Sequence, residues 1–181
     1  MTTLRLGSAL AAVAAAAMIS PAFAVDEQPA ATPYPLDAIP EKLPFAEPYG
    51  LPISVTTAQR LLQEAASEAT KHGWPLSVAV VDSGGTLVAF LRMDGANLAS
   101  ADIAIAKAIS AVKFRRPTKV FEEAIQKKSF NYLTTLPSIV ASRGGIPLLD
   151  KGAVVGAIGC SGGTGSQDEA VCAAAVASLS R

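Results

Sequence analysis

A glycine-rich loop near the end of the chain is the first candidate for ligand binding. Residues 161–166 read Ser-Gly-Gly-Thr-Gly-Ser and follow a continuous apolar run at 153–160. An alanine-rich segment with helical spacing begins at Gln167. A strand, a glycine turn and a helix in this order expose backbone N–H groups at a helix N-terminus, where anions can bind.

The composition of this loop argues against phosphate binding. It lacks the Gly-Lys-Ser/Thr ending of a Walker loop and the Gly-x-Gly-x-x-Gly spacing of a dinucleotide site. Asp168 and Glu169 place two carboxylates in the first helical turn. They would repel a phosphate from the positive end of the helix dipole. We therefore expect neighbouring carboxylates to neutralise the backbone of this turn.

Hydrolytic and metal chemistry lack the residues that they need. His72 is the only histidine, so a histidine-rich zinc site is impossible within one chain. A Ser-His-Asp triad would have to use His72, and no Gly-x-Ser-x-Gly elbow supports one. His72 lies beside Gly73, a helix stop, where a cation is favourable at the helix C-terminus. We expect a capping role for His72 and assign no catalytic residue.

Several cations could pair with the carboxylates of a ligand: Arg92, Lys107, Lys113, Arg115 and Arg116. Lys107 stands in an otherwise apolar helical segment, so we expect its side chain to extend to the surface, with neutralisation of a ligand carboxylate as the alternative. Covalent c-type haem attachment is excluded because no Cys-x-x-Cys-His is present. Usual axial donors to haem iron are few: His72, Met93, the tyrosines, Cys160 and Cys172.

The elements that would position these residues alternate little between strand and helix. In chain order we expect a helix capped by Thr56 with Gln59, a hairpin over 76–91, a helix over 98–114, a helix over 119–127 capped by Thr118, a short strand at 146–149, a strand at 153–160 and a final helix capped by Ser166 with Glu169. Pro147 places its strand at a sheet edge or a bulge. Clustered hairpins without repeated βαβ units predict an α+β domain with an antiparallel sheet.

The first 53 residues differ in composition from the rest. Residues 1–24 combine Arg5, an apolar run and a small-x-small ending at Ala24, which predicts a secretory signal cleaved after Ala24 and a periplasmic or secreted protein. Residues 25–53 hold seven of the 12 prolines and are expected to form a semi-rigid arm or linker. Phe45 and Tyr49 offer the alternative, an arm tacked onto the domain or a neighbouring subunit. The domain itself would be 54–181.

The charge balance limits the partners that we expect, and the cysteines limit the redox state. The chain has 15 basic and 15 acidic residues, and loss of the signal removes only Arg5. This balance gives no electrostatic reason to expect nucleic acid or an anionic membrane as partner. No later apolar run is long enough for a membrane span. Cys160 and Cys172 lie in apolar surroundings, so we expect free cysteines, with a disulfide as the alternative that export permits.

Three segments together resemble the GlcG/HbpS family of haem-binding proteins, whose domain recurs at the C-terminus of PduO-type proteins. They read VAVVDSGGTLVAFLRMDGA at 78–96, AKAISAVKFRRPT at 106–118 and GGIPLLDKGAVVGAIGCSGGTGSQDEAV at 144–171. The resemblance covers roughly residues 54–181. It implies a five-stranded antiparallel sheet flanked by helices, a homo-oligomer with an octamer as one candidate size, and binding of haem or a related tetrapyrrole.

The resemblance also implies site residues. The threonine of the family's Pro-Thr motif, a proposed contact of the haem iron, falls on Thr118, and we place Arg115, Arg116 and Lys113 near the propionates. The resulting hypothesis is an exported haem-binding protein, serving haem sequestration or as an accessory to sensing, and not itself an established enzyme. The alternative is an enzyme or enzyme accessory acting on a small hydroxy- or oxo-acid, with Arg143, Lys107 and residues 161–166 lining its pocket. A scaffold without a ligand is a third interpretation.

Overall fold

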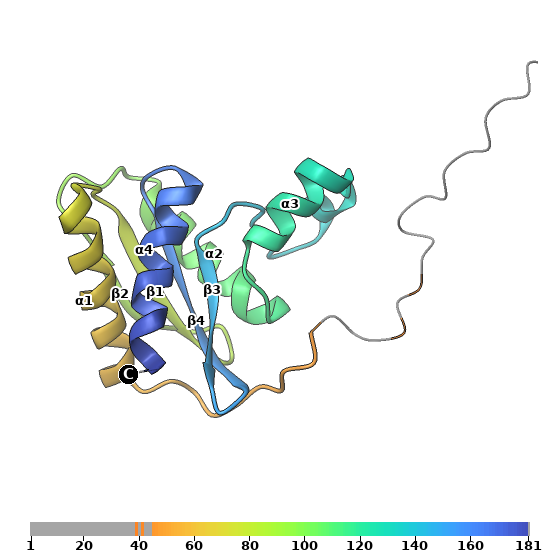
Figure 1. The fold of residues 1–181 in the computed structure, drawn as a ribbon, viewed down its shortest axis with the longest axis horizontal. Helices are drawn as coiled ribbons and strands as arrows, with labels where there is room; N and C mark the ends of the chain where they lie inside the picture. The colour runs from red at the N-terminus through yellow and green to blue at the C-terminus, as the bar shows by residue number, and fades with distance from the viewer. Residues whose placement is uncertain (1–38, 40, 42–44, 181) are drawn as a thin grey trace, which may run out of the picture. The chain divides into compact units, whose positions relative to one another are not determined.

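The computed structural model describes residues 39, 41 and 45–180 (Figure 1). The predicted signal peptide, its cleavage after Ala24 and most of the proline-rich arm lie outside the described residues. In chain order the elements are α1 Val55–His72, β1 Ser77–Asp82, β2 Leu87–Arg92, α2 Ser100–Phe114, α3 Lys119–Lys128, η2 Asn131–Thr135, β3 Gly145–Asp150, β4 Ala153–Ser161, α4 Gly165–Ala177 and η3 Ser178–Ser180. None of the described helices is long and apolar enough to cross a membrane.

The sheet is antiparallel and has four strands in the order β2-β1-β4-β3. The predicted α+β class is confirmed, whereas the five strands implied by the resemblance are wrong for the described residues. The described part of the arm makes one isolated parallel bridge, Tyr49 to Val154, beside β4 where β1 has ended. Prolines at 48 and 52 cannot donate a ladder hydrogen bond, which keeps this contact from extending into a fifth strand. Pro147 lies in β3 at the sheet edge, as predicted.

Helices cover both faces of the sheet (Figure 1). α1 and α4 pack together on one face over the larger apolar cluster, which includes Leu61, Val80, Ile158 and Val171. α2 lies on the other face, where Ala108, Ala111 and Val112 pack against Val81, Val154 and Ala157. α3 and η2 form a small lobe after α2, and among their residues only Phe121 and Leu133 are buried. The lobe therefore presents most of its side chains to the surface.

Two glycines let α2 approach the sheet at backbone distance. A Cβ on Gly159 of β4 would overlap the carbonyl oxygen of Ala104, and a Cβ on Gly145 of β3 would overlap that of Lys107. Both glycines face α2 and pair with each other across the β3–β4 ladder. This close approach fixes where the side chains of α2 reach the end of the sheet.

Two helix starts differ from the prediction. Ser54, not Thr56, caps α1 by accepting from the N–H of Thr57. Thr164, not Ser166, caps α4 in a capping box with Gln167. Thr164 satisfies the same capping-box pattern two residues earlier than Ser166, whereas Ser54 caps α1 without a Glu or Gln at the third helical position, so the box pattern alone does not select the cap. Because Gln167 completes the second box, Glu169 is left to contact other elements.

Cys160 and Cys172 form a disulfide that joins β4 to α4. The expectation of free cysteines is therefore wrong. α4 folds back against the strand that precedes it, and the two Cα atoms lie 5.8 Å apart. That separation is within the range that a disulfide spans.

Candidate functional site

The predicted propionate partners lie together at the junction between α2 and α3. Lys113 occupies the last turn of α2 and donates to the hydroxyl of Ser138 at 3.1 Å. Arg115 ends the helix in the left-handed conformation, with φ of 52°. Arg116 follows and is half-buried. We call Lys113, Arg115 and Arg116 the basic corner.

Part of the proline-rich arm packs directly on the basic corner. Arg115 donates to the carbonyl oxygen of Glu47 at 2.7 Å, and its guanidinium lies 5.5 Å from the ring centre of Tyr49. The guanidinium of Arg116 lies 3.3 Å from the ring centre of Phe45. The Tyr49 hydroxyl is 3.0 Å from each of two carbonyl oxygens at the end of α2, those of residues 112 and 113. This stretch is thus tacked onto the domain, and the expectation of a free spacer is wrong for it.

Arg116 is held between aromatic rings. Besides Phe45 of the arm, Phe121 of α3 lies 5.4 Å from its guanidinium and packs edge-on against Phe114. Burial lowers the pKa of the Arg116 guanidinium, Arg115 lowers it further, and Tyr132 opposes both. The Nε of Arg116 donates to the Phe114 carbonyl at 3.2 Å, and its remaining planar donors can serve a carboxylate while the guanidinium contacts the rings.

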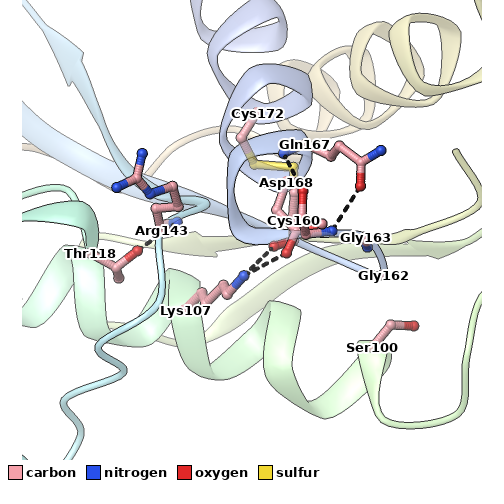
Figure 2. A network of polar contacts seen from close by, with 12 residues as sticks. Ser100, Lys107, Thr118, Arg143, Cys160, Gly162, Gly163, Gln167, Asp168 and Cys172 are labelled. Atoms are coloured by element: carbon pink, nitrogen blue, oxygen red, sulfur yellow. Dashed lines mark hydrogen bonds and ion pairs between the residues drawn. A yellow bond between two sulfur atoms is a disulfide. The ribbon is translucent and has the colours of Figure 1, made fainter. Parts of the chain in front are cut away.

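Thr118 is fully buried and holds the start of β3. Its hydroxyl oxygen accepts from the N–H of Gly145 at 2.9 Å, and its own N–H donates to the Gly145 carbonyl at 3.0 Å (Figure 2). Thr118 is the N-cap residue of α3, as predicted, but its side chain makes no capping hydrogen bond to that helix. The hydroxyl is committed to the strand because Gly145 lies directly opposite. The contact of Thr118 with haem iron stays a prediction.

Lys107 is buried, so its expected extension to the surface is wrong. Its ammonium lies 2.7 Å from Asp168 Oδ2 and 3.2 Å from the carbonyl oxygen of Cys160 (Figure 2). The side chain runs from α2 past the start of β3 to the first turn of α4. Gly144 leaves room there, since a Cβ on it would come within 3.2 Å of the ammonium. Asp168 Oδ1 also accepts from the N–H of Gly163 at 3.0 Å, so this carboxylate neutralises the glycine loop as expected.

Arg143, the other cation of the alternative hypothesis, is bound to two carboxylates. Its guanidinium lies 2.7 Å from the carboxylate of Glu122 and 3.4 Å from that of Glu169. Its backbone N–H also donates to the Glu122 carboxylate, at 2.8 Å. The hydrogen bond from Arg143 holds the pKa of Glu122 below its usual value, and the same contact raises that of Arg143. Lys119 also reaches Glu169, at 3.2 Å. Both cations assigned to the alternative are therefore paired within the chain.

Several partners of these residues did not follow from the sequence. Phe121 and Tyr132 were not assigned to the basic corner, although aromatic residues near two consecutive arginines are a usable signal. Asp168 was seen as a charge near the loop, not as the partner of Lys107. One cation and one anion in two alanine-rich helices could have suggested the pair, because buried charges are nearly always paired.

A hollow of about 650 Å³ lies elsewhere, between the start of α1 and the β3–β4 turn. Its wall includes Ile53, Arg60, Leu149 and Lys151 and contains none of the predicted site residues. Within the described part of the chain, no three His, Cys, Asp or Glu side chains are grouped to hold a metal ion.

Three similar proteins share this fold or sequence. Protein GlcG of Escherichia coli K12 is 37% identical over 109 residues, 60% of this chain and 81% of that protein. A double mutant of Streptomyces reticuli HbpS matches with a TM-score of 0.67 and 33% identity, over 78% of this chain and 97% of that one. A PduOC:heme complex matches with a TM-score of 0.64 and 28% identity, over 70% and 94%.

The family model described as "Haem degrading protein HbpS-like" matches residues 53–177. These boundaries agree with those of the folded domain, from the end of the arm to the end of α4. The three segments singled out in the sequence all lie within the match. The chain therefore belongs to the HbpS-like family, in which the GlcG and HbpS proteins are its relatives.

Proposed function

We propose that this protein binds haem, or a related tetrapyrrole, at the basic corner and holds it rather than transforming a substrate. The observation that carries the proposal is the match to a haem-named family together with the similarity to a solved haem complex. Lys107 and Arg143 are already paired with carboxylates, so no contact among the described residues favours the hydroxy- or oxo-acid alternative.

The residues at the basic corner suit the chemistry of haem. Haem has a flat apolar face and two propionates, and it needs apolar contact together with cationic donors. Lys113, Arg115 and Arg116 supply the cations. The adjoining lobe of α3 and η2 supplies exposed apolar surface at Val120 and Tyr132. In this proposal the arginines bind the propionates and the lobe covers one face of the ring.

The donor to the iron is the weaker part of this fit. Thr118 would have to release the N–H of Gly145 before its hydroxyl met an iron, because it is fully buried. Both cysteines are joined in the disulfide and cannot serve as thiolates. Tyr132 is 45% exposed and lies in the lobe beside the basic corner. The side chain of His72 is 46% exposed. Thr118→Val, Tyr132→Phe and His72→Ala therefore form one series, in which the true donor changes the spectrum of ferric haem.

Export and assembly are further parts of the proposal. The pattern of residues 1–24 supports a periplasmic or secreted location. Leu87, Phe90 and Ile103 are exposed apolar residues that a homo-oligomer would cover. Cell fractionation tests the location, and size-exclusion chromatography with light scattering tests the assembly and its octameric candidate size. A monomer at micromolar concentration would contradict the oligomer alone.

The central test is titration of haemin into the mature protein that begins at Val25. We expect a Soret band that is weakened in Arg115→Gln/Arg116→Gln. Lys127→Gln/Lys128→Gln removes the same charge from the exposed end of α3 and serves as the matched control. A band that persists for hours indicates holding, whereas a band that decays indicates degradation. The absence of any spectral change at micromolar haemin would contradict haem binding.

A further inference from the structure

The arm segment 45–50 covers the cations that the proposed haem site needs. Arg115 and Arg116 each contact an arm aromatic ring, and Arg115 also donates to an arm carbonyl. Both arginines thus have partners within the chain before any ligand arrives. A propionate can take the place of the Glu47 carbonyl on Arg115, because a carboxylate is the stronger acceptor for a guanidinium.

The same segment is fastened at its far end by the sheet. The N–H of Gly50 donates to the carbonyl of Val154 at 2.8 Å, and the N–H of Val154 donates to the carbonyl of Pro48 at 2.8 Å. A Cβ on Gly50 would come within 3.0 Å of Ala153, so the backbone lies close against β4. Residues 48–50 are therefore held on β4 by backbone hydrogen bonds, while Phe45, Glu47 and Tyr49 of the same segment contact the arginines, so release of the segment from the arginines also frees these backbone bonds.

We propose that residues 45–50 form a strap that closes the basic corner and that a ligand with two anionic groups binds by displacing it. This inference rests on the proposed function, since it concerns the regulation of the same site. The strap holds the two arginines through contacts that are weaker than an ion pair, namely two ring faces and one neutral carbonyl. A dianion forms two charge-assisted contacts with the arginines and therefore displaces the strap. A ligand with one carboxylate forms only one such contact.

The geometry gives the strap a selective effect. Before the strap moves, the binding-competent state is a minor one, and the apparent affinity falls by its fraction. The loss of two cation–π contacts and the hydrogen bond of one phenol, shared between two carbonyls, corresponds to an increase in affinity of roughly tenfold. Removal of the strap aromatics should therefore tighten binding, although it removes contacts from the neighbourhood of the site.

The experiment compares wild type, Phe45→Ala/Tyr49→Ala and the milder Tyr49→Phe, which keeps the ring over Arg115. Glu47→Gln is the control, since only the backbone carbonyl of that residue is used. Circular dichroism and the melting temperature verify folding. Each protein is titrated with haemin and, separately, with inorganic pyrophosphate, and amide hydrogen exchange is followed at Gly50 and Val154.

The expected result is roughly tenfold tighter binding in the double variant, a smaller gain in Tyr49→Phe and none in Glu47→Gln. In wild type, bound ligand should accelerate exchange at Gly50 and Val154. Equal affinity in wild type and the double variant would overturn the strap, and so would unchanged exchange in a protein that binds either probe. Failure of both probes to bind any of these proteins would overturn it too.

The two proposals fail in different ways. If haemin gives no Soret band in any variant but pyrophosphate binds and releases the strap, haem binding is wrong and the strap stands. If haemin binds wild type and the double variant equally, haem binding stands and the strap is wrong.

Discussion

The ammonium of Lys107 lies 2.7 Å from the carboxylate of Asp168, with side chains only 1% and 3% exposed. The pair joins α2 on one face of the sheet to α4 on the other, past the glycines at the start of β3. Each charge is costly to bury alone, so each residue requires the other. The carbonyl of Cys160 and the N–H of Gly163 complete the hydrogen bonding of the pair.

Lys107→Met should lower the free energy of unfolding by about 3–5 kcal/mol, because it leaves the Asp168 carboxylate buried without its partner. Urea unfolding at neutral pH measures the loss. Lys127→Met breaks an exposed ion pair with Glu123 and should have a much smaller effect, because solvent screens that pair. Lys107→Met/Asp168→Leu should recover much of the loss. Equal effects of the Lys107 and Lys127 variants would contradict the structural role of the buried pair.

Loss of the disulfide should also destabilise the domain. Cys160→Ala/Cys172→Ala should lower the free energy of unfolding by about 2–4 kcal/mol, since the bridge limits the entropy of the unfolded chain. Thermal unfolding of the oxidised protein and of the variant gives the comparison. Protein purified from an oxidising compartment and denatured without reductant should show no reactive thiol. Labelling of two thiols under those conditions would show that the cysteines are free.

Gly159→Ala should disrupt the packing of α2 on the sheet, because the new Cβ would overlap the Ala104 carbonyl. We expect a loss of at least about 3 kcal/mol or failure to fold. Gly152→Ala is the contrast, since nothing lies within 4 Å of its Cβ and only its φ of 80° opposes the change. That variant should cost about 1 kcal/mol. Chemical unfolding of both variants checks the order, and a costlier Gly152→Ala would contradict it.

The local elements followed from sequence because their patterns are local. The apolar alternation of the hairpin, the helical spacing before Gly73 and the edge position of Pro147 depend on neighbours a few residues away. The choice between Ser54 and Thr56 as a cap did not follow, since both lie in acceptable patterns and the packing of the helix selects one. The fifth strand was inferred from resemblance, and the prolines of the arm oppose it.

The site was less predictable because its contacts join distant segments. Lys107 and Asp168 are 61 residues apart, and Arg115 and Glu47 are 68 apart. No periodicity in the sequence reports such a contact. The fate of Cys160 likewise depended on how far α4 folds back along β4. Lys113, Arg115 and Arg116 lie together because they are nearly adjacent in the chain, and their role in haem binding stays a prediction, whereas the arm that covers them was not expected there.

The contact between Glu122 and Arg143 should make stability depend on pH in acid. Arg143 holds the folded-state pKa of Glu122 below its ordinary value of 4.5, so this contribution is complete above that value and is lost as the pH falls through the lowered folded-state pKa. Arg143→Gln should therefore lower the free energy of unfolding near neutral pH. The difference in the free energy of unfolding between wild type and Arg143→Gln should then narrow steadily as the pH falls below 4.5.

Urea unfolding of wild type and Arg143→Gln across this range measures that gap directly. Lys127→Gln, which breaks the exposed contact with Glu123, should show little gap at any pH. A gap for Arg143→Gln that widens as the pH falls would contradict the assignment, because protonation of Glu122 removes the charge that Arg143 stabilises. A constant gap would mean that Arg143 acts through its packing rather than through the ionised Glu122.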